Sequence, residues 1–148
     1  MKKQDFQIHR VQTDKELAMV FSVREEVFMG EQQVSHEEEF DEFEEISRHF
    51  VAIGLQGEAL GCSRWRYTEK GIKLERFAVR KPFRGAGVGS ALVQATLADI
   101  RAMAGEGVFL YLHAQLDAVS LYEKSGFVKQ GDQFLECDIW HYKMSRSS

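Results

Sequence analysis

The chain of 148 residues lacks the features that mark membrane, metal-binding and disulfide-rich proteins. It has one proline and two cysteines, and Cys62 and Cys137 lie far apart, outside any Cys-x-x-Cys motif or Cys/His cluster. Neither a disulfide scaffold nor a zinc site is indicated, and each cysteine is expected to be a small buried hydrophobic residue in a reducing cytoplasm. The longest apolar run has five residues, whereas a membrane span needs roughly 18 to 20. No signal peptide is visible in the polar first ten residues, so neither a membrane nor export is expected.

Acidic residues are concentrated in one segment. The protein has 19 basic and 23 acidic residues and a formal net charge of −4, but seven of the nine residues at positions 37–45 are acidic. The other 139 residues carry 19 basic and 16 acidic side chains and are slightly basic. No basic face with interleaved aromatic residues is visible, so nucleic acid is not an expected partner. With 44% hydrophobic and 28% charged residues, the composition is typical of a single soluble domain over residues 1–148.

The first half of the chain predicts a short strand, a helix and a docked acidic segment. Thr13 and Glu16 have the spacing of a capping box, and the apolar residues behind them form one helical stripe as far as Phe28. Arg24 lies inside this stripe, where an unpaired charge is costly, so we expect the acidic segment to supply its partner. Apolar residues within the acidic segment favour docking on the protein over a free tail.

The second half predicts strands, a glycine-rich turn and a crossover helix. Strands at 50–55, 59–67 and 73–79 are joined by short turns, and Pro82 ends the last of them. A helix follows to about residue 104, and the apolar run 108–112 is typical of a strand buried on both faces. Asp117 is expected to N-cap a short helix before two final strands. The expected fold is α/β (an α+β mixed sheet), with helices flanking a central mixed β-sheet and a right-handed crossover between two parallel strands.

The turn after Pro82 reads Arg84-Gly85-Ala86-Gly87-Val88-Gly89. Its glycines allow backbone N–H groups to approach a ligand closely, and the first turn of the following helix adds further donors, so together they can form an anion site. The alternative is a tight turn without a ligand. The chain lacks the lysine of a P-loop, and Ser90 stands where the dinucleotide fingerprint needs its third glycine.

Three motifs together carry a family resemblance. The turn has the pattern Arg-x-x-Gly-x-Gly, and its flanking motifs are Leu74-Glu75-Arg76-Phe77-Ala78-Val79 and Leu121-Tyr122-Glu123-Lys124-Ser125-Gly126-Phe127. In this order and spacing the chain resembles the GNAT superfamily of acyl-CoA-dependent N-acetyltransferases, and most of its remaining length resembles a small single-domain bacterial branch. The resemblance implies a GNAT fold with acetyl-CoA (coenzyme A) as co-substrate and no metal. Members of the superfamily often dimerise, so a homodimer is one expectation.

The resemblance also implies where coenzyme A binds. Its pyrophosphate would lie on the backbone amides of the glycine turn, and its pantetheine arm would pair with the preceding strand like an added strand. The thioester would lie in the wedge where the strands ending at Val79 and Gln115 splay apart. Gln115, where many relatives have asparagine, would contact either the pantetheine or a helix cap. The implied cofactor-binding residues are Phe77, Ala78, Val79, Arg84, Gly85, Ala86, Gly87, Val88, Gly89, Gln115 and Tyr122.

Acyl transfer to an amine requires a neutral nucleophile, a polarised carbonyl and a proton for the leaving thiolate. Tyr122 stands where the family has the tyrosine that protonates, or hydrogen-bonds to, the sulfur of coenzyme A; the alternative is simple packing. Glu75 is the candidate that accepts the amine proton through water, if an apolar setting raises its pKa. Its alternative is a salt bridge to a neighbouring cation. A backbone N–H, of Phe77 or Val79, would hold the developing oxyanion.

Two functions remain open. The favoured one is an acetyl-CoA-dependent N-acetyltransferase that moves an acetyl group to a primary amine by direct attack. The alternative is a non-catalytic acyl-CoA-binding regulatory module. The acidic segment is either a solvated or Arg24-paired face, or a set of carboxylates that selects a cationic amine. His113 and His141 are expected to be structural, although either could line the acceptor cleft.

Overall fold

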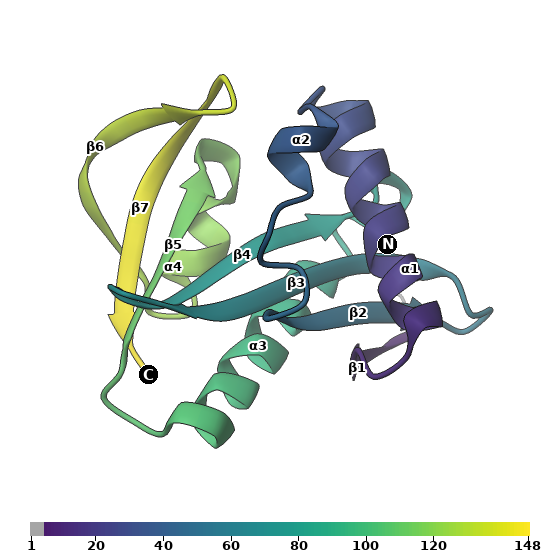
Figure 1. Cartoon of the computed structure of the whole chain (residues 1–148), viewed down its shortest axis with the longest axis horizontal. Helices are drawn as coiled ribbons and strands as arrows, with labels where there is room; N and C mark the ends of the chain where they lie inside the picture. The colour runs from purple at the N-terminus through teal and green to yellow at the C-terminus, as the bar shows by residue number, and fades with distance from the viewer. Residues whose placement is uncertain (1–4) are drawn as a thin grey trace.

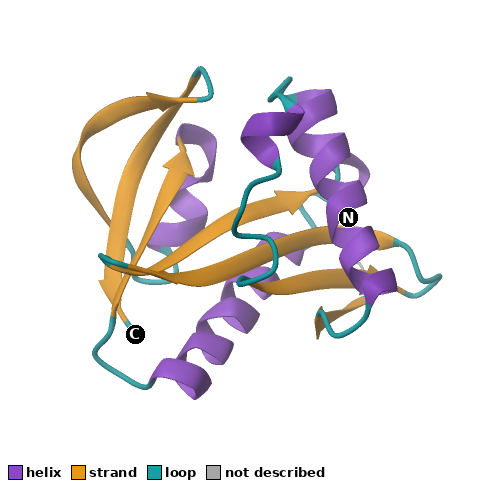
Figure 2. Cartoon of the chain, in the orientation of Figure 1, coloured by secondary structure: helices purple, strands orange, loops and turns teal. Residues whose placement is uncertain are grey.

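A seven-stranded mixed sheet runs through the molecule, with helices on both of its faces (Figures 1 and 2). The computed structural model describes residues 5–148, so the first four residues of the polar start lie outside the described part. The strand order is β1-β2-β3-β4-β5-β7-β6, and every neighbouring pair is antiparallel except β4 and β5. The strands are β1 (Phe6–Arg10), β2 (Arg48–Gly54), β3 (Ala59–Thr68), β4 (Gly71–Val79), β5 (Phe109–Gln115), β6 (Val128–Glu136) and β7 (Ile139–Ser147).

The helical elements alternate with these strands in the predicted order, which confirms the expected fold class. Two helices of more than ten residues cover opposite faces of the sheet, and the others are short turns at its edges (Figure 1). They are α1 (Asp14–Arg24), the π-helical η1 (Glu25–Glu31), α2 (His36–Glu39), the 3-10 turn η2 (Lys81–Phe83), α3 (Val88–Ala104), the 3-10 turn η3 (Leu116–Ala118) and α4 (Val119–Glu123).

The helix α1 begins where the capping box predicts. The Thr13 hydroxyl accepts the Glu16 N–H at 3.1 Å, and the Glu16 carboxylate accepts the Gln12 N–H at 2.9 Å, so free amides at the helix start gain partners. After Arg24 the helix widens into η1. The N–H of Gln32, directly after η1, donates to the carbonyl of Val27, five residues earlier, at 3.0 Å. The apolar stripe therefore continues past α1, but with the wider spacing of a π-helix.

Two apolar clusters hold the helices on the sheet. Residues of α3 pack on one face, against alternate residues of β2 to β5, and residues of α1 and η1 pack on the other face. Because each strand alternates its side chains between the faces, the central strands are buried on both sides. The larger cluster includes Leu60, Trp65, Leu74, Leu92, Ile100 and Leu110, and the smaller includes Val20, Val23, Val27, Val51 and Cys62.

The strands β4 and β5 pair only where they begin. Ile72 lies opposite Leu110 and Lys73 opposite Tyr111, and beyond these pairs the two strands diverge (Figure 1). A bulge in the β3–β4 ladder follows, at which Arg76 adopts a left-handed φ of +60°. The parallel pair joined by α3 and the splayed wedge both match the prediction.

Two local predictions are wrong. Asp117 does not cap a helix, because the extra 3-10 turn η3 comes first and α4 begins after Ala118 without a side-chain cap. Cys62 is buried as expected, but Cys137 is exposed, because it sits in the two-residue turn between β6 and β7 with φ +51°. No helix in residues 5–148 is both long and apolar enough to cross a membrane.

Candidate active site

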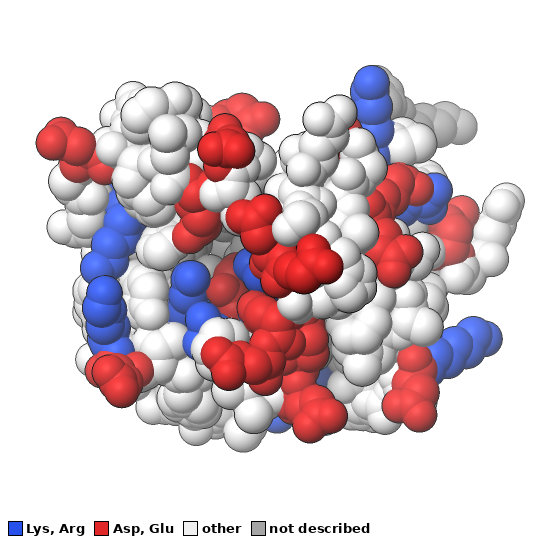
Figure 3. All heavy atoms as spheres, turned by 45° about the horizontal axis from the view of Figure 1, so that its top comes forward, with Lys and Arg blue, Asp and Glu red and all other residues white. Residues whose placement is uncertain are grey.

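A cavity of about 400 Å³ lies where β4 and β5 diverge. Its walls come from η1, the acidic segment, both strands of the wedge, α4 and the β6–β7 hairpin. On this face of the molecule acidic side chains gather in a central patch beside a hollow, with basic side chains next to them (Figure 3). Several sequence-predicted residues line the cavity together, namely Glu75, Phe77, His113, Gln115, Tyr122 and His141.

The glycine turn lies between β4 and α3 as predicted. Gly87 immediately precedes α3 with a left-handed φ of +88°, and a Cβ at this position would meet no atom within 4 Å. The first helical amides, of Val88, Gly89 and Ser90, have no partner within the helix, and no other residue of the described chain accepts a hydrogen bond from them. Open space and unpaired N–H groups are what a bound anion requires, so the residues fit a phosphate group.

Two basic side chains beside this turn, those of Arg80 and Arg84, are paired. Arg84 donates from its two terminal nitrogens to the Glu31 carboxylate at 2.7 and 2.9 Å, and from Nε to the Val79 carbonyl at 2.8 Å. Arg80 donates to Glu26 at 3.0 Å, and both glutamates belong to η1. The Arg84–Glu31 pair is exposed to solvent, so it contributes about 1 kcal/mol at most and can exchange with an anionic ligand.

The edge of β4 that faces β5 is free of strand partners beyond Lys73 within residues 5–148. Phe77, Ala78 and Val79 form the last part of this edge, immediately before the glycine turn region. An unpaired strand edge exposes backbone donors and acceptors that an extended ligand can use as an additional strand. The free edge connects the glycine turn to the cavity.

Tyr122 and Gln115 both line the cavity. The Tyr122 ring is buried edge-on to Phe77, with 5.5 Å between ring centroids, and burial and the charge of Asp117 raise the pKa of its hydroxyl. The phenol is therefore protonated at neutral pH and can donate. Gln115 exchanges side-chain amide hydrogen bonds of 2.9 and 3.3 Å with Gln32, across the cavity. It makes no side-chain cap bond to η3, so the helix-cap alternative is wrong.

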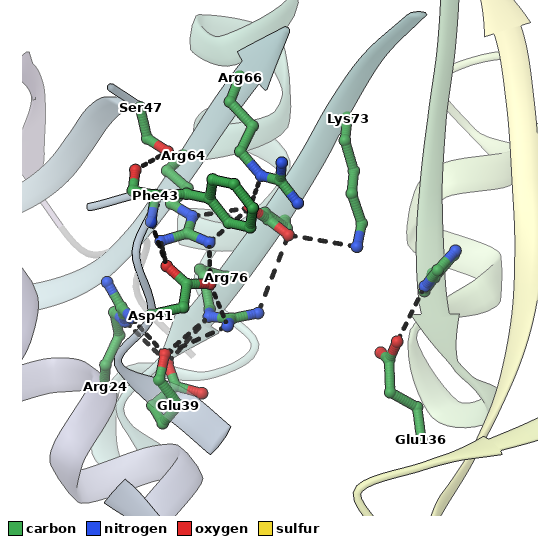
Figure 4. Close-up of polar contacts among 12 residues, drawn as sticks. Arg24, Glu39, Asp41, Phe43, Ser47, Arg64, Arg66, Lys73, Arg76 and Glu136 are labelled. Carbon is green, nitrogen blue, oxygen red and sulfur yellow. Dashed lines mark hydrogen bonds and ion pairs between the residues drawn. The ribbon is translucent and has the colours of Figure 1, made fainter. Parts of the chain in front are cut away.

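Glu75 does not lie in the apolar setting that its role as a base presumes, because its carboxylate is paired with Arg64, Arg66 and Lys73, which are labelled in Figure 4. Its Oε2 accepts from Arg64 Nε at 2.9 Å and from Arg66 Nε at 2.7 Å, and its Oε1 lies 3.4 Å from Lys73 Nζ. Burial favours the neutral acid, but the surrounding cations outweigh it and lower the pKa of Glu75 to about 2. The expected rise in pKa is wrong, because the bulge that follows separates Glu75 from the apolar side chains of Phe77 and Val79. The salt-bridge alternative is what the structure shows.

The acidic segment docks on buried arginines. Arg24 Nε donates to Glu39 at 2.7 Å and its Nη1 donates to Glu44 at 2.8 Å, while Arg64 Nη2 donates to Asp41 at 2.8 Å. Both arginine side chains are fully buried. The expected pairing of Arg24 with the acidic segment is therefore confirmed. Three of the seven carboxylates of the acidic segment are paired with these two arginines, and the other four are exposed to solvent.

Glu136, Lys73 and Arg66 also line the cavity, and these three residues have no clear sequence signal. His113 Nδ1 lies 3.0 Å from Glu136 Oε1, and His141 Nε2 lies 3.8 Å from Glu136 Oε2. On the opposite wall Lys73 and Arg66 project from β4 and β3. These residues reach one cavity only because β3 pairs with β4 and β5 pairs with β7. The spacing of the residues in the sequence does not reveal these strand pairings. Among residues 5–148, no three Cys, His, Asp or Glu side chains are grouped as metal ligands.

Known proteins resemble this chain over nearly its whole length. A family model for the acetyltransferase (GNAT) domain matches residues 8–148. A Bacillus subtilis protein named "Uncharacterized N-acetyltransferase YjcF" is 41% identical over 134 residues, covering 90% of this chain and 94% of the relative. YyaT of the same organism is 32% identical over 142 residues, covering 94% of each. The crystal structure of an acyl-CoA N-acyltransferase from Pseudomonas aeruginosa superposes with a TM-score of 0.82 at 27% identity, covering 97% of this chain and 99% of the other.

Proposed function

Because the chain belongs to the GNAT acetyltransferase family, it is an acyl-CoA-dependent acetyltransferase, and we propose that it transfers the acetyl group of acetyl-CoA to a primary amine by direct attack. One observation carries the proposal. The free edge of β4 leads from the unpaired amides of the glycine turn into the cavity beside Tyr122. A long ligand with an anionic end and a reactive end fits this path.

Coenzyme A binding is assigned to the turn and to the strand edge. The backbone amides of residues 84–89 hold the pyrophosphate, supported by the first turn of α3. Backbone groups of Phe77, Ala78 and Val79 pair with the pantetheine arm, which directs the thioester toward the wedge. Arg84 exchanges its exposed Glu31 partner for a phosphate oxygen when the ligand binds.

The transfer step follows from the residues at the end of this path. The neutral amine attacks the carbonyl carbon of the acetyl group, a C–N bond forms and the C–S bond breaks. The backbone N–H of Phe77 or Val79 stabilises the negative charge on the carbonyl oxygen. Tyr122 donates its hydroxyl proton to the leaving thiolate and regains a proton from water, and its raised pKa keeps the hydroxyl protonated between turnovers. The amine proton passes to water, since Glu75 is held as an ionised partner of arginines.

Acetyl-CoA turnover with a panel of primary amines tests the proposal, with release of free thiol as the readout. We expect thiol release that depends on an amine and yields the N-acetyl product. Coenzyme A binding without transfer to any amine would contradict the proposal and support an acyl-CoA-binding module instead.

A further inference from the structure

The cavity walls carry opposite charge, and this difference bears on which amine is accepted. Lys73 and Arg66 line one wall and Glu136 lies on the other (Figure 4), and the exposed Glu38 adds a second carboxylate to the lining. Lys73 and Arg66 belong to the ion-pair cluster that holds the acidic segment. The net charge of their wall therefore depends on whether the cluster has as many carboxylates as cations.

The cluster contains one more cation than it has carboxylates. Ion pairs of 4 Å or less connect its members, and no pair among the described residues extends to another acidic side chain. The five cations are Arg24, Arg64, Arg66, Lys73 and Arg76, and the four carboxylates are Glu39, Asp41, Glu44 and Glu75. The cluster therefore keeps a net positive charge, which a buried site stabilises only with an anion or water nearby.

The spare donors of the cluster face the cavity. Arg24 and Arg64 each use all three guanidinium nitrogens in hydrogen bonds. Arg66 donates only through Nε, and Lys73 has a single ion pair, at 3.4 Å, within residues 5–148. The side chains of Arg66 and Lys73 are 13% and 17% exposed, so both reach the cavity while most of each stem is buried.

The opposite wall presents a carboxylate. The Glu136 side chain is 44% exposed and is hydrogen-bonded to His113, whose ring packs edge-on against Phe134 at 5.0 Å. The hydrogen bond from His113 lowers the pKa of Glu136, and the charge of Lys73 contributes across the cavity. Glu136 is therefore an ionised group in reach of a cationic or hydrogen-bonding amine.

We propose that the acceptor is a small zwitterionic amine, in which a carboxylate lies a few bonds from the primary amine, as in an amino acid. The carboxylate binds to Lys73 and the terminal nitrogens of Arg66, and the amine faces Glu136. This inference rests on the proposed acetyl transfer and specifies its substrate class. A second ammonium group would meet the surplus cation of the β3–β4 wall, so simple diamines are disfavoured.

Matched pairs of amines test the inference. L-lysine is compared with cadaverine and L-tyrosine with tyramine, because the members of each pair differ only by the carboxylate. We expect kcat/KM to be higher for the amino acid of each pair by about tenfold or more, the effect of one charge-assisted interaction. Lys73→Met lowers kcat/KM for the amino acids by a similar factor and leaves tyramine within about twofold, whereas kcat/KM for cadaverine rises because the surplus cation that its second ammonium meets is gone. The exposed Lys70→Met is the control and changes neither.

A second variant separates the two ends of the acceptor. Glu136→Gln raises KM for both members of each pair, because it acts on the amine that they share. Equal use of amino acid and decarboxylated amine would overturn the inference, as would an equal effect of Lys73→Met on both. In either case transfer still occurs, so the proposed function survives. Absence of transfer to all four compounds and to the wider amine panel, with coenzyme A bound, would overturn both.

Discussion

Replacing Glu75 with glutamine tests whether this residue acts as an ion-pair partner or as a base. The carboxylate accepts from Arg64 and Arg66 and lies close to Lys73 inside a cluster that already has a surplus cation. Glu75→Gln keeps the size of the side chain and removes its charge. The cluster then has two cations in excess, because Arg66 and Lys73 have no other carboxylate partner among the described residues.

The size of the effect follows from the lowered pKa of Glu75. A fall from the ordinary value of 4.5 to about 2 corresponds to ~3 kcal/mol of stability at neutral pH, at 1.36 kcal/mol per pH unit. Since the pKa is lower in the folded than in the unfolded protein, this stability is fully present above pH 4.5 and is lost as the pH falls toward 2. At pH 4 the wild type has lost about 1 kcal/mol of this contribution to the free energy of unfolding. The Glu75→Gln variant lacks the contribution at every pH and so does not show this loss.

Urea unfolding at pH 7 and pH 4 measures both quantities. We expect Glu75→Gln to be less stable by ~3 kcal/mol at pH 7, with the difference smaller by about 1 kcal/mol at pH 4. Glu69→Gln, at an exposed position in the β3–β4 turn, is the control and stays within about 0.5 kcal/mol. A wild type and a Glu75→Gln variant with the same stability at pH 7 would refute the reasoning. A pH–kcat profile that loses its acidic limb in the still-folded variant would instead restore Glu75 as a base.

Two further substitutions test the cofactor side of the site. Tyr122→Phe is expected to lower kcat by roughly 10²-fold or more while coenzyme A affinity changes little, because only the proton donor is lost. An unchanged kcat, with the exposed Tyr67→Phe as control, would remove Tyr122 from the mechanism. Gly87→Ala and Gly107→Ala both force a Cβ into a left-handed φ with open space around it, so each costs about 1 to 2 kcal/mol of stability. Only Gly87→Ala weakens coenzyme A binding, measured by calorimetry, and equal affinity in both variants would refute the phosphate assignment.

Most of the fold could be predicted because the signals for it are local. The capping box at Thr13 fixes the start of α1, and the glycine turn fixes the start of α3, each within a few residues of chain. The apolar run at the β5 position identifies a buried parallel strand, which implies the crossover. Such signals need no knowledge of what lies beside them in space.

The predictions that differ from the structure depend on long-range partners or on backbone irregularities. The widening of α1 into η1 adds a residue per turn, which leaves no distinct mark in the apolar pattern. The bulge at Arg76 interrupts the strand alternation on which the setting of Glu75 was inferred. The helix-cap alternative for Gln115 is wrong, because its side chain pairs with Gln32, which lies 83 residues away in the sequence.

Charge read along the sequence differs from the charge that is left at this site after ion pairing. The acidic segment suggests an acidic amine side, yet Arg24 and Arg64 neutralise its central carboxylates from other elements. The basic residues near the glycine turn suggest a cationic cofactor side, yet Arg84 there is matched by Glu31 of η1. What a ligand meets is the charge left after such pairing, because paired ions are already satisfied and resist exchange when buried. In the cavity that remainder is positive at Lys73 and Arg66 and negative at Glu136 and Glu38, and this separation of charge is the basis for the proposed zwitterionic acceptor.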